Sequence, residues 1–81
     1  MMEILRTPDE RFENLAGYPF TPNYLTISDR STATGVRIHY IDEGNPESQP
    51  ILMLHGEPSW SFIYRKMVKP FTEEGFRVLA P

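Results

Sequence analysis

This chain of 81 residues contains no cysteine, so disulfide bonds, thiolate nucleophiles and cysteine-ligated metal centres are excluded within it. It also lacks an excess of positive charge. Its 8 lysines and arginines are outnumbered by 11 aspartates and glutamates, which gives a formal net charge of -3 at pH 7. Because nucleic-acid-binding domains normally present a basic surface, we expect no nucleic acid among its partners.

Long apolar runs are missing as well. No stretch approaches the roughly 20 apolar residues that span a bilayer, and residues 1–6 lack the basic region and the apolar segment of a signal peptide. We therefore expect no membrane association and a cytoplasmic location. With 40% hydrophobic and 23% charged residues, the composition is that of an ordinary globular protein.

The stretch from Ile51 to Trp60 organises the rest of the chain. Ile51–Leu54 is a continuous apolar run, which predicts a parallel strand covered on both faces. The loop His55–Pro58 interrupts this pattern with a glycine and a proline. An apolar stripe at helical spacing follows and predicts a helix packed on the sheet: Trp60, Ile63, Tyr64, Met67, Val68 and Phe71. Open α/β sheets bind their ligands at such strand-to-helix loops.

Three residues should shape this helix. Ser59 is a candidate N-cap, Pro70 should kink the helix, and Gly75 should follow its last turn as the C′ residue. Arg77–Ala80 then predicts a strand parallel to Ile51–Leu54, which completes a βαβ unit. Because a parallel pair normally needs both faces covered, we interpret residues 1–81 as the N-terminal portion of a single, larger α/β domain that is incomplete here.

Two earlier runs, Tyr24–Ser28 and Val36–Glu43, predict an antiparallel strand pair. The polar loop Asp29–Gly35 joins them as a hairpin connection. The second run alternates, which places Arg37 and His39 on its polar face, and we expect His39 to be solvated there.

The segment from Arg6 to Asn23 is rich in proline and glycine and predicts a surface lead-in with one helical turn from Asp9 to Leu15. Thr7 is its candidate N-cap and Pro8 its first helical residue. The segment should pack on the body through its large apolar side chains, Phe12, Leu15, Tyr18 and Phe20.

Only the loop His55–Pro58 carries a chemical signal. His55 has no accompanying nucleophile or orienting acid, which favours a structural, hydrogen-bonded histidine over a catalytic base. Gly56 fits a role in backbone conformation, which would also let backbone N–H groups point at a substrate. Glu57 is either a solvated surface charge or an oxyanion-hole residue, with its carboxylate near a reacting water. Neither Ser59 nor Ser61 has the Gly-x-Ser-x-Gly setting of a nucleophile.

The motif His55-Gly56-Glu57-Pro58-Ser59-Trp60-Ser61, continued by Tyr64-Arg65-Lys66-Met67, resembles the oxyanion-loop region of haloalkane dehalogenases in the α/β-hydrolase superfamily. The segments Arg6–Phe12 and Tyr18–Tyr24 are similar to the N-terminal region of the same family, in the subgroup with glutamate where many relatives have asparagine. The resemblance covers nearly the whole chain. The loop after Ser28, as far as Thr34, departs from the family pattern.

This resemblance implies hydrolysis of a carbon–halogen bond through a covalent alkyl-enzyme ester, with a haloalkane and water as substrates and halide as a product. It implies that the backbone N–H of Glu57 belongs to the oxyanion hole, that its side chain lies near the hydrolytic water, and that His55, Gly56, Pro58 and Trp60 support the loop. The nucleophile, the catalytic histidine, its acidic partner and the halide-binding tryptophans would lie outside this chain. No metal or organic cofactor is implied, and we expect a monomer when the protein is intact.

Two other functions stay open. Epoxide hydrolases and related members of the superfamily share the fold and an aspartate nucleophile, and they would differ in the residues that bind the leaving group. Alternatively, the chain is a non-enzymatic interaction module whose sheet edge and apolar face recruit a partner. We expect the isolated 81-residue chain to be inactive as an enzyme.

Overall fold

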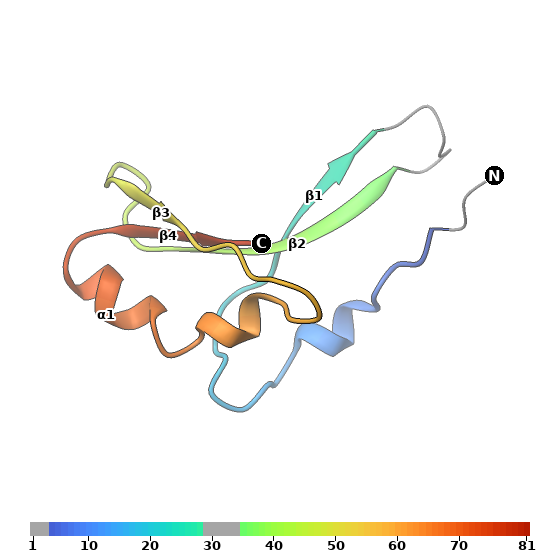
Figure 1. Cartoon of the computed structure of the whole chain (residues 1–81), viewed down its shortest axis with the longest axis horizontal. Helices are drawn as coiled ribbons and strands as arrows, with labels where there is room; N and C mark the ends of the chain where they lie inside the picture. The colour runs from blue at the N-terminus through green and yellow to red at the C-terminus, as the bar shows by residue number, and fades with distance from the viewer. Residues whose placement is uncertain (1–3, 29–34) are drawn as a thin grey trace.

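A computed structural model describes residues 4–28 and 35–81 as one four-stranded mixed sheet with short helices on one side (Figure 1). The strands lie in the order β1-β2-β4-β3. Their bounds are Asn23–Ile27 for β1, Val36–Glu43 for β2, Pro50–Leu52 for β3 and Arg77–Ala80 for β4. The predicted antiparallel pair β1–β2 and the predicted parallel pair β3–β4 are both confirmed. An antiparallel pairing of β2 with β4, which the sequence did not predict, joins the two pairs.

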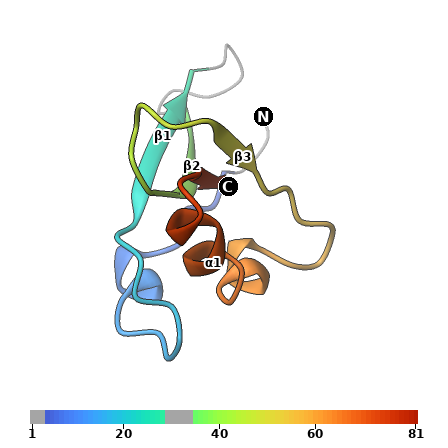
Figure 2. The same cartoon turned by 90° about the vertical axis from the view of Figure 1, so that its left-hand side faces the viewer.

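The core lies between the sheet and helix α1, Val68–Glu73, which connects β3 to β4. Figures 1 and 2 place this helix on the same side of the sheet as the short helix η2, Ser61–Tyr64. The buried apolar side chains come from the lead-in, from three strand regions and from α1: Tyr18, Ile41, Met53, Val68, Val78 and Ala80. The expected lead-in packing is confirmed, because Leu15 and Phe20 also pack against this core.

The predicted strand Ile51–Leu54 is shorter and less covered than expected. Regular pairing ends at Leu52, although the Met53 N–H still donates to the Leu79 carbonyl at 2.9 Å. Leu52 and Leu54 are 59% and 65% exposed, whereas Met53 between them is buried. One face of the strand is therefore bare, because helices lie on only one side of the sheet, as expected for an incomplete portion of a larger α/β domain.

The predicted continuous helix is also wrong, since two short helices replace it. Helix η2 has 3₁₀ geometry, and residues 65–67 form turns before α1 begins at Val68. Pro70 therefore lies in the first turn of α1, where a missing N–H costs nothing because no acceptor is available there. An uninterrupted helix would instead bring the proline ring against the carbonyl of Lys66. The proline thus limits where the helix can begin and does not kink it.

This break changes which side chains of the apolar stripe are buried. Val68 is fully buried, and Trp60, Tyr64 and Phe71 pack partly against the core, as expected. Ile63 and Met67 are 55% and 44% exposed. The predicted stripe assumed one continuous helix, and the break between η2 and α1 turns these two side chains away from the core.

The predicted end of the helix is confirmed at Gly75, whose φ is +93°. The Gly75 N–H donates to the Thr72 carbonyl at 3.1 Å and the Phe76 N–H to the Phe71 carbonyl at 3.0 Å. These two bonds form a Schellman motif. The rings of Phe71 and Phe76 meet edge to face at 6.3 Å, which supplies the apolar contact that often accompanies this motif.

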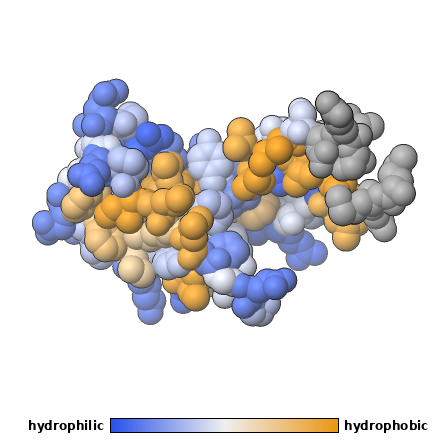
Figure 3. Space-filling view, turned by 45° about the horizontal axis from the view of Figure 1, so that its top comes forward, coloured by the Kyte–Doolittle hydropathy of each residue, from blue (hydrophilic) through white to orange (hydrophobic). Residues whose placement is uncertain are grey.

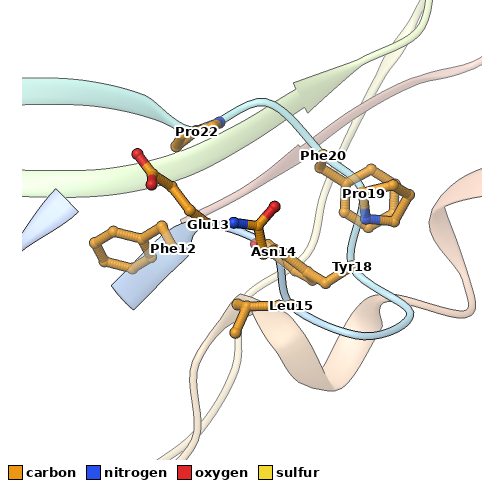
Figure 4. A pocket seen from close by; sticks show the side chains of 8 residues that line it. All are labelled: Phe12, Glu13, Asn14, Leu15, Tyr18, Pro19, Phe20 and Pro22. Carbon is orange, nitrogen blue, oxygen red and sulfur yellow. The ribbon is translucent and has the colours of Figure 1, made fainter. Parts of the chain in front are cut away.

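The lead-in contains one helical turn, η1, Asp9–Phe12, with 3₁₀ geometry. Pro8 occupies the N-cap position with no side-chain bond, so the assignments of Thr7 as N-cap and Pro8 as first helical residue were wrong. The Thr7 carbonyl instead accepts a hydrogen bond from Arg37 at 2.7 Å. Beside η1 the segment folds back and encloses a surface hollow of about 620 Å³ (Figure 4).

Most of the expected hairpin loop, residues 29–34, lies outside the described residues. Gly35 at its end is described and has φ +77°, in the region that glycine adopts most readily. A Cβ at this position would lie 2.8 Å from the Ile27 carbonyl oxygen, so the close approach of β1 also requires glycine.

The side of the sheet away from the helices is uncovered and carries exposed apolar areas. Figure 3, in which the top of Figure 1 is turned forward, shows apolar areas toward the β3–β4 end and toward the β1–β2 end. The exposed strand residues that contribute to this side are Leu25, Ile27 and Leu52. Among the described residues, no helix is long and apolar enough to cross a bilayer.

Candidate functional site in the loop after strand β3

The candidate site is the loop between Met53, the last residue bonded to β4, and Ser61, the first residue of η2. A turn forms its centre, because the Ser59 N–H donates to the Gly56 carbonyl at 2.9 Å. The Glu57–Pro58 peptide bond inside this turn is cis. His55, Gly56, Glu57 and Pro58 are all exposed, so the tip of the loop faces solvent.

Glu57 lies at the exposed tip. Within residues 4–28 and 35–81, its backbone N–H donates to no backbone acceptor and its carboxylate forms no ion pair. Both groups can therefore meet a ligand or water, which is consistent with either of the roles that the sequence left open.

His55 is hydrogen-bonded within the loop. Its Nδ1 lies 3.1 Å from the Gly56 carbonyl oxygen, which can only accept, so Nδ1 carries the proton in this contact. The sequence favoured a hydrogen-bonded structural histidine, and this bond agrees with that interpretation. The ring is nevertheless exposed and lies past the end of β3.

Trp60 anchors the end of the loop in an aromatic cluster. Its ring centroid lies 5.4 Å from that of Tyr18, 5.6 Å from that of Phe62 and 5.7 Å from that of Phe12. Tyr18 and Phe12 belong to the lead-in, so aromatic contacts with Trp60 pack the lead-in against the end of the loop. Trp60 also takes the N-cap position of η2, so the assignment of Ser59 as N-cap was wrong.

Two tyrosine hydroxyls brace the loop. The Tyr64 hydroxyl donates to the Leu54 carbonyl immediately before His55. The Tyr18 hydroxyl lies 2.8 Å from the Ser61 hydroxyl, and Ser61 is fully buried. Burial raises the pKa of Tyr18, so its hydroxyl keeps its proton at neutral pH. A buried, bonded hydroxyl cannot attack a substrate, which agrees with the exclusion of Ser61 as a nucleophile.

The sequence pattern predicted only apolar packing for Tyr18 and Tyr64, and the hydrogen bonds of their hydroxyls were not predicted. The available signal was tyrosine in place of phenylalanine in an apolar stripe, because a buried phenol normally finds a hydrogen-bond partner.

A cavity of about 590 Å³ lies next to the loop, and His39 is one of the residues that line it. The expectation that His39 is solvated was wrong. His39 stacks on Phe12, with centroids 4.0 Å apart and planes 5° apart, and its Nε2 is buried without a partner among the described residues. Burial, followed by the nearby charge of Arg37, lowers the pKa of His39. The lead-in covers the face that the sequence predicted to be solvated. The cavity is lined by Thr7, Arg11, Phe12, Arg37, Ile38, His39, His55, Trp60, Ser61 and Pro81.

The described part of the chain contains no group of three or more histidine and acidic side chains placed to hold a metal ion.

The chain is similar to known proteins along nearly its whole length. No protein-family profile matches the chain. It is similar to the haloalkane dehalogenase of Mycolicibacterium paratuberculosis, with 55% identity over 80 residues, 99% of this chain and 26% of the relative. It is also similar to the haloalkane dehalogenase of Psychrobacter cryohalolentis, with 54% identity over 80 residues, 99% of this chain and 26% of the relative. The chain thus spans about a quarter of the length of these relatives.

Among solved structures, the chain is similar to haloalkane dehalogenase DpaA from Paraglaciecola agarilytica, which is described as tetrameric. The TM-score is 0.82 at 48% identity, and the match covers 99% of this chain and 26% of that chain.

Proposed function

We propose that this chain, a homologue of the haloalkane dehalogenases along nearly its whole length, supplies the oxyanion loop of an enzyme that hydrolyses haloalkanes. The observation that carries this proposal is 55% identity over 80 of the 81 residues, a span that includes the loop after β3. The fold supports it, because the loop follows a parallel strand at the position where α/β sheets bind their ligands.

The proposed reaction has two steps. An aspartate carboxylate outside this chain attacks the alkyl carbon, the carbon–halogen bond breaks, and an alkyl ester and a halide ion form. A histidine outside this chain then takes a proton from water as the water attacks the ester carbonyl, and the ester splits into the alcohol and the regenerated carboxylate. An oxyanion develops on the carbonyl oxygen only in the second step.

Glu57 acts in the second step. Its exposed backbone N–H, which has no backbone acceptor within the described residues, donates to the oxyanion, and its carboxylate lies near the attacking water. His55, Gly56, Pro58 and Trp60 give the loop its shape, with Trp60 anchored in the aromatic cluster.

The intact protein should need only a small haloalkane and water, without a cofactor, a nucleic acid or a membrane, and should act in the cytoplasm. We propose a monomer. Because the similar structure of DpaA is described as tetrameric, sedimentation of the intact protein tests this point directly.

A chimera provides the test of activity. The 80 residues of the Mycolicibacterium paratuberculosis relative that align with this chain are replaced by the corresponding residues of this chain. Halide release from 1-bromobutane is then measured. The chimera should turn over the substrate, whereas the isolated 81-residue chain should release no halide above the buffer rate. A folded chimera without turnover would contradict the proposed function.

Two substitutions in the chimera distinguish the role of the Glu57 backbone N–H from the role of its carboxylate. Glu57→Gln keeps the N–H and nearly the same side-chain shape, so ester hydrolysis should slow only modestly. Glu57→Pro removes the donor, which should slow this step by about 10²–10³-fold or more. Halide displacement forms no oxyanion, so the proline variant should still give a burst of halide and accumulate the ester.

Single-turnover kinetics with mass spectrometry of the quenched protein measures both steps. If both variants fold and Glu57→Gln loses as much hydrolysis as Glu57→Pro, the carboxylate is the essential group and the backbone assignment is wrong.

A further inference from the structure

We propose that Tyr64 is a positioning residue for ester hydrolysis: its hydroxyl holds the Leu54 carbonyl and thereby fixes where the Glu57 N–H points. This inference rests on the proposed function of the loop. Tyr64 itself touches no reacting atom and acts through the backbone.

The upstream end of the loop needs an anchor at Leu54. Pairing with β4 stops at Met53, whose N–H bonds to the Leu79 carbonyl at 2.9 Å, and Leu54 is exposed. Beyond this point, within residues 4–28 and 35–81, no sheet bond orients the peptide groups that lead to Glu57. The Tyr64 hydroxyl bonds to the Leu54 carbonyl across ten positions of sequence, so the peptide that precedes His55 is held where the sheet no longer holds it.

The downstream end is anchored independently. Ser61 begins η2, is fully buried, and shares a hydrogen bond of 2.8 Å with the buried Tyr18 of the lead-in. The turns of η2 are closed by bonds from the Ile63 N–H to the Trp60 carbonyl and from the Arg65 N–H to the Phe62 carbonyl, both 3.1 Å. Tyr64 therefore projects from a fixed base.

The two anchors close the loop into a braced unit. The chain leaves the sheet at Leu54, makes the turn from Gly56 to Ser59, enters η2 and returns through the Tyr64 hydroxyl to Leu54. Fixing both ends of a short loop reduces its conformational freedom before substrate binds. An oxyanion donor works only at about 2.7–3.1 Å from the developing charge, so a small displacement of this loop lowers the rate.

Tyr64→Phe in the chimera tests this role, because it removes the hydroxyl and keeps the ring. We expect ester hydrolysis to slow about 10-fold or more, while the rate and amplitude of the halide burst stay unchanged. Tyr24→Phe is the matched control. It makes the same chemical change at a buried hydroxyl that has no partner among the described residues, so neither step should change.

A second measurement does not depend on activity. Hydrogen–deuterium exchange of the backbone amides of residues 55–59 should be several-fold faster in Tyr64→Phe than in wild type or Tyr24→Phe, with exchange in β1 and β2 unaffected. If the wild-type chimera shows no turnover, the proposed function fails, and this exchange still decides whether Tyr64 holds the loop.

Three results would overturn the inference. The first is loop exchange in Tyr64→Phe that equals the control. The second is faster loop exchange with unchanged ester hydrolysis, which would mean that the brace does not serve catalysis. The third is an equal slowing of both chemical steps together with a lower melting temperature, which would show a general loss of structure.

Discussion

Asp42 and Glu43 are neighbours on β2, and their surroundings shift their pKa values in opposite directions. Arg77 donates to both carboxylate oxygens of Asp42, at 2.8 and 2.6 Å, and these bonds hold the pKa of Asp42 below its usual range. Burial, and then the nearby charge of Asp42, raises the pKa of Glu43. Since successive strand residues face opposite sides, adjacent acids on one strand meet different environments.

These shifts predict opposite effects on stability. The folded pKa of Asp42 is lower than the unfolded value, so Asp42 stabilises the fold at neutral pH, and this contribution is lost as the pH falls below about 4. The folded pKa of Glu43 is higher, so its contribution is largest at low pH and is lost as the pH rises through that folded pKa. In the chimera, Asp42→Asn should lower the melting temperature by a few degrees at pH 7, and Glu43→Gln should raise it.

Both differences should shrink near pH 3, because Asp42 then loses part of its stabilising contribution, while Glu43 is protonated in both the folded and the unfolded state. Circular dichroism melts at the two pH values measure this. A Glu43→Gln variant that is less stable than wild type at pH 7 would show that the carboxylate has a stabilising partner in the intact protein.

At the scale of elements, the chain after the loop shows what local sequence can and cannot specify. Gly75 marks the end of α1 because its φ of +93° is costly for other residues, and this signal is local. Helix α1 begins only at Val68, because Pro70 is tolerated in the first turn and not deeper in a helix. The 3₁₀ helix η2 before it is tied to other parts of the chain by hydrogen bonds of Ser61 and Tyr64. The Tyr18–Ser61 bond spans 43 positions of the sequence and the Tyr64–Leu54 bond spans 10, so neither partner follows from the local pattern.

A matched pair of glycines tests the end of the helix. A Cβ at Gly75 would meet no atom within 4 Å, so Gly75→Ala should cost only its backbone conformation, about 1 kcal/mol of the free energy of unfolding. A Cβ at Gly44, which has φ +95°, would lie 2.5 Å from the Phe76 carbonyl oxygen, so Gly44→Ala should cost clearly more. Urea denaturation of the two chimera variants measures the difference, and equal losses would contradict the packing argument.

At the scale of the whole molecule, the sheet has one covered face and one uncovered face. The lead-in and the helices cover the first face through Phe12, Trp60 and Val68. The second face exposes Leu25, Ile27 and Leu52. Exposed apolar areas of this kind, one toward each end of the sheet, mark an interface or an aggregation site.

We therefore predict that the isolated 81-residue chain self-associates or folds poorly. The double substitution Leu25→Lys and Leu52→Lys should reduce association in sedimentation velocity, because it places charge on the uncovered face. Ile63→Lys, at a residue that is also 55% exposed but lies in η2 on the other side, should not. A monomeric wild-type chain with a sharp cooperative thermal transition would refute this prediction.

Features that depend on local pattern were predictable from the amino-acid sequence. Alternation gave β2 its bounds, Val36–Glu43, and the crossover from β3 to β4 required a parallel pair. Gly75 marked a helix end, and the motif His55–Ser61 pointed to the loop and, through resemblance, to the haloalkane dehalogenases that the comparisons then found.

Features that depend on contacts between distant segments became visible only in the folded chain. Periodicity gives the two faces of a strand but not which face is covered, so His39 was expected in solvent and lies stacked beneath Phe12. A tyrosine in an apolar stripe signals a hydrogen bond without naming the acceptor, which for Tyr64 is the Leu54 carbonyl, ten residues earlier. The physical reason is the same in each case: residue spacing fixes directions along one element, whereas burial and hydrogen bonding depend on a partner that folding brings from another.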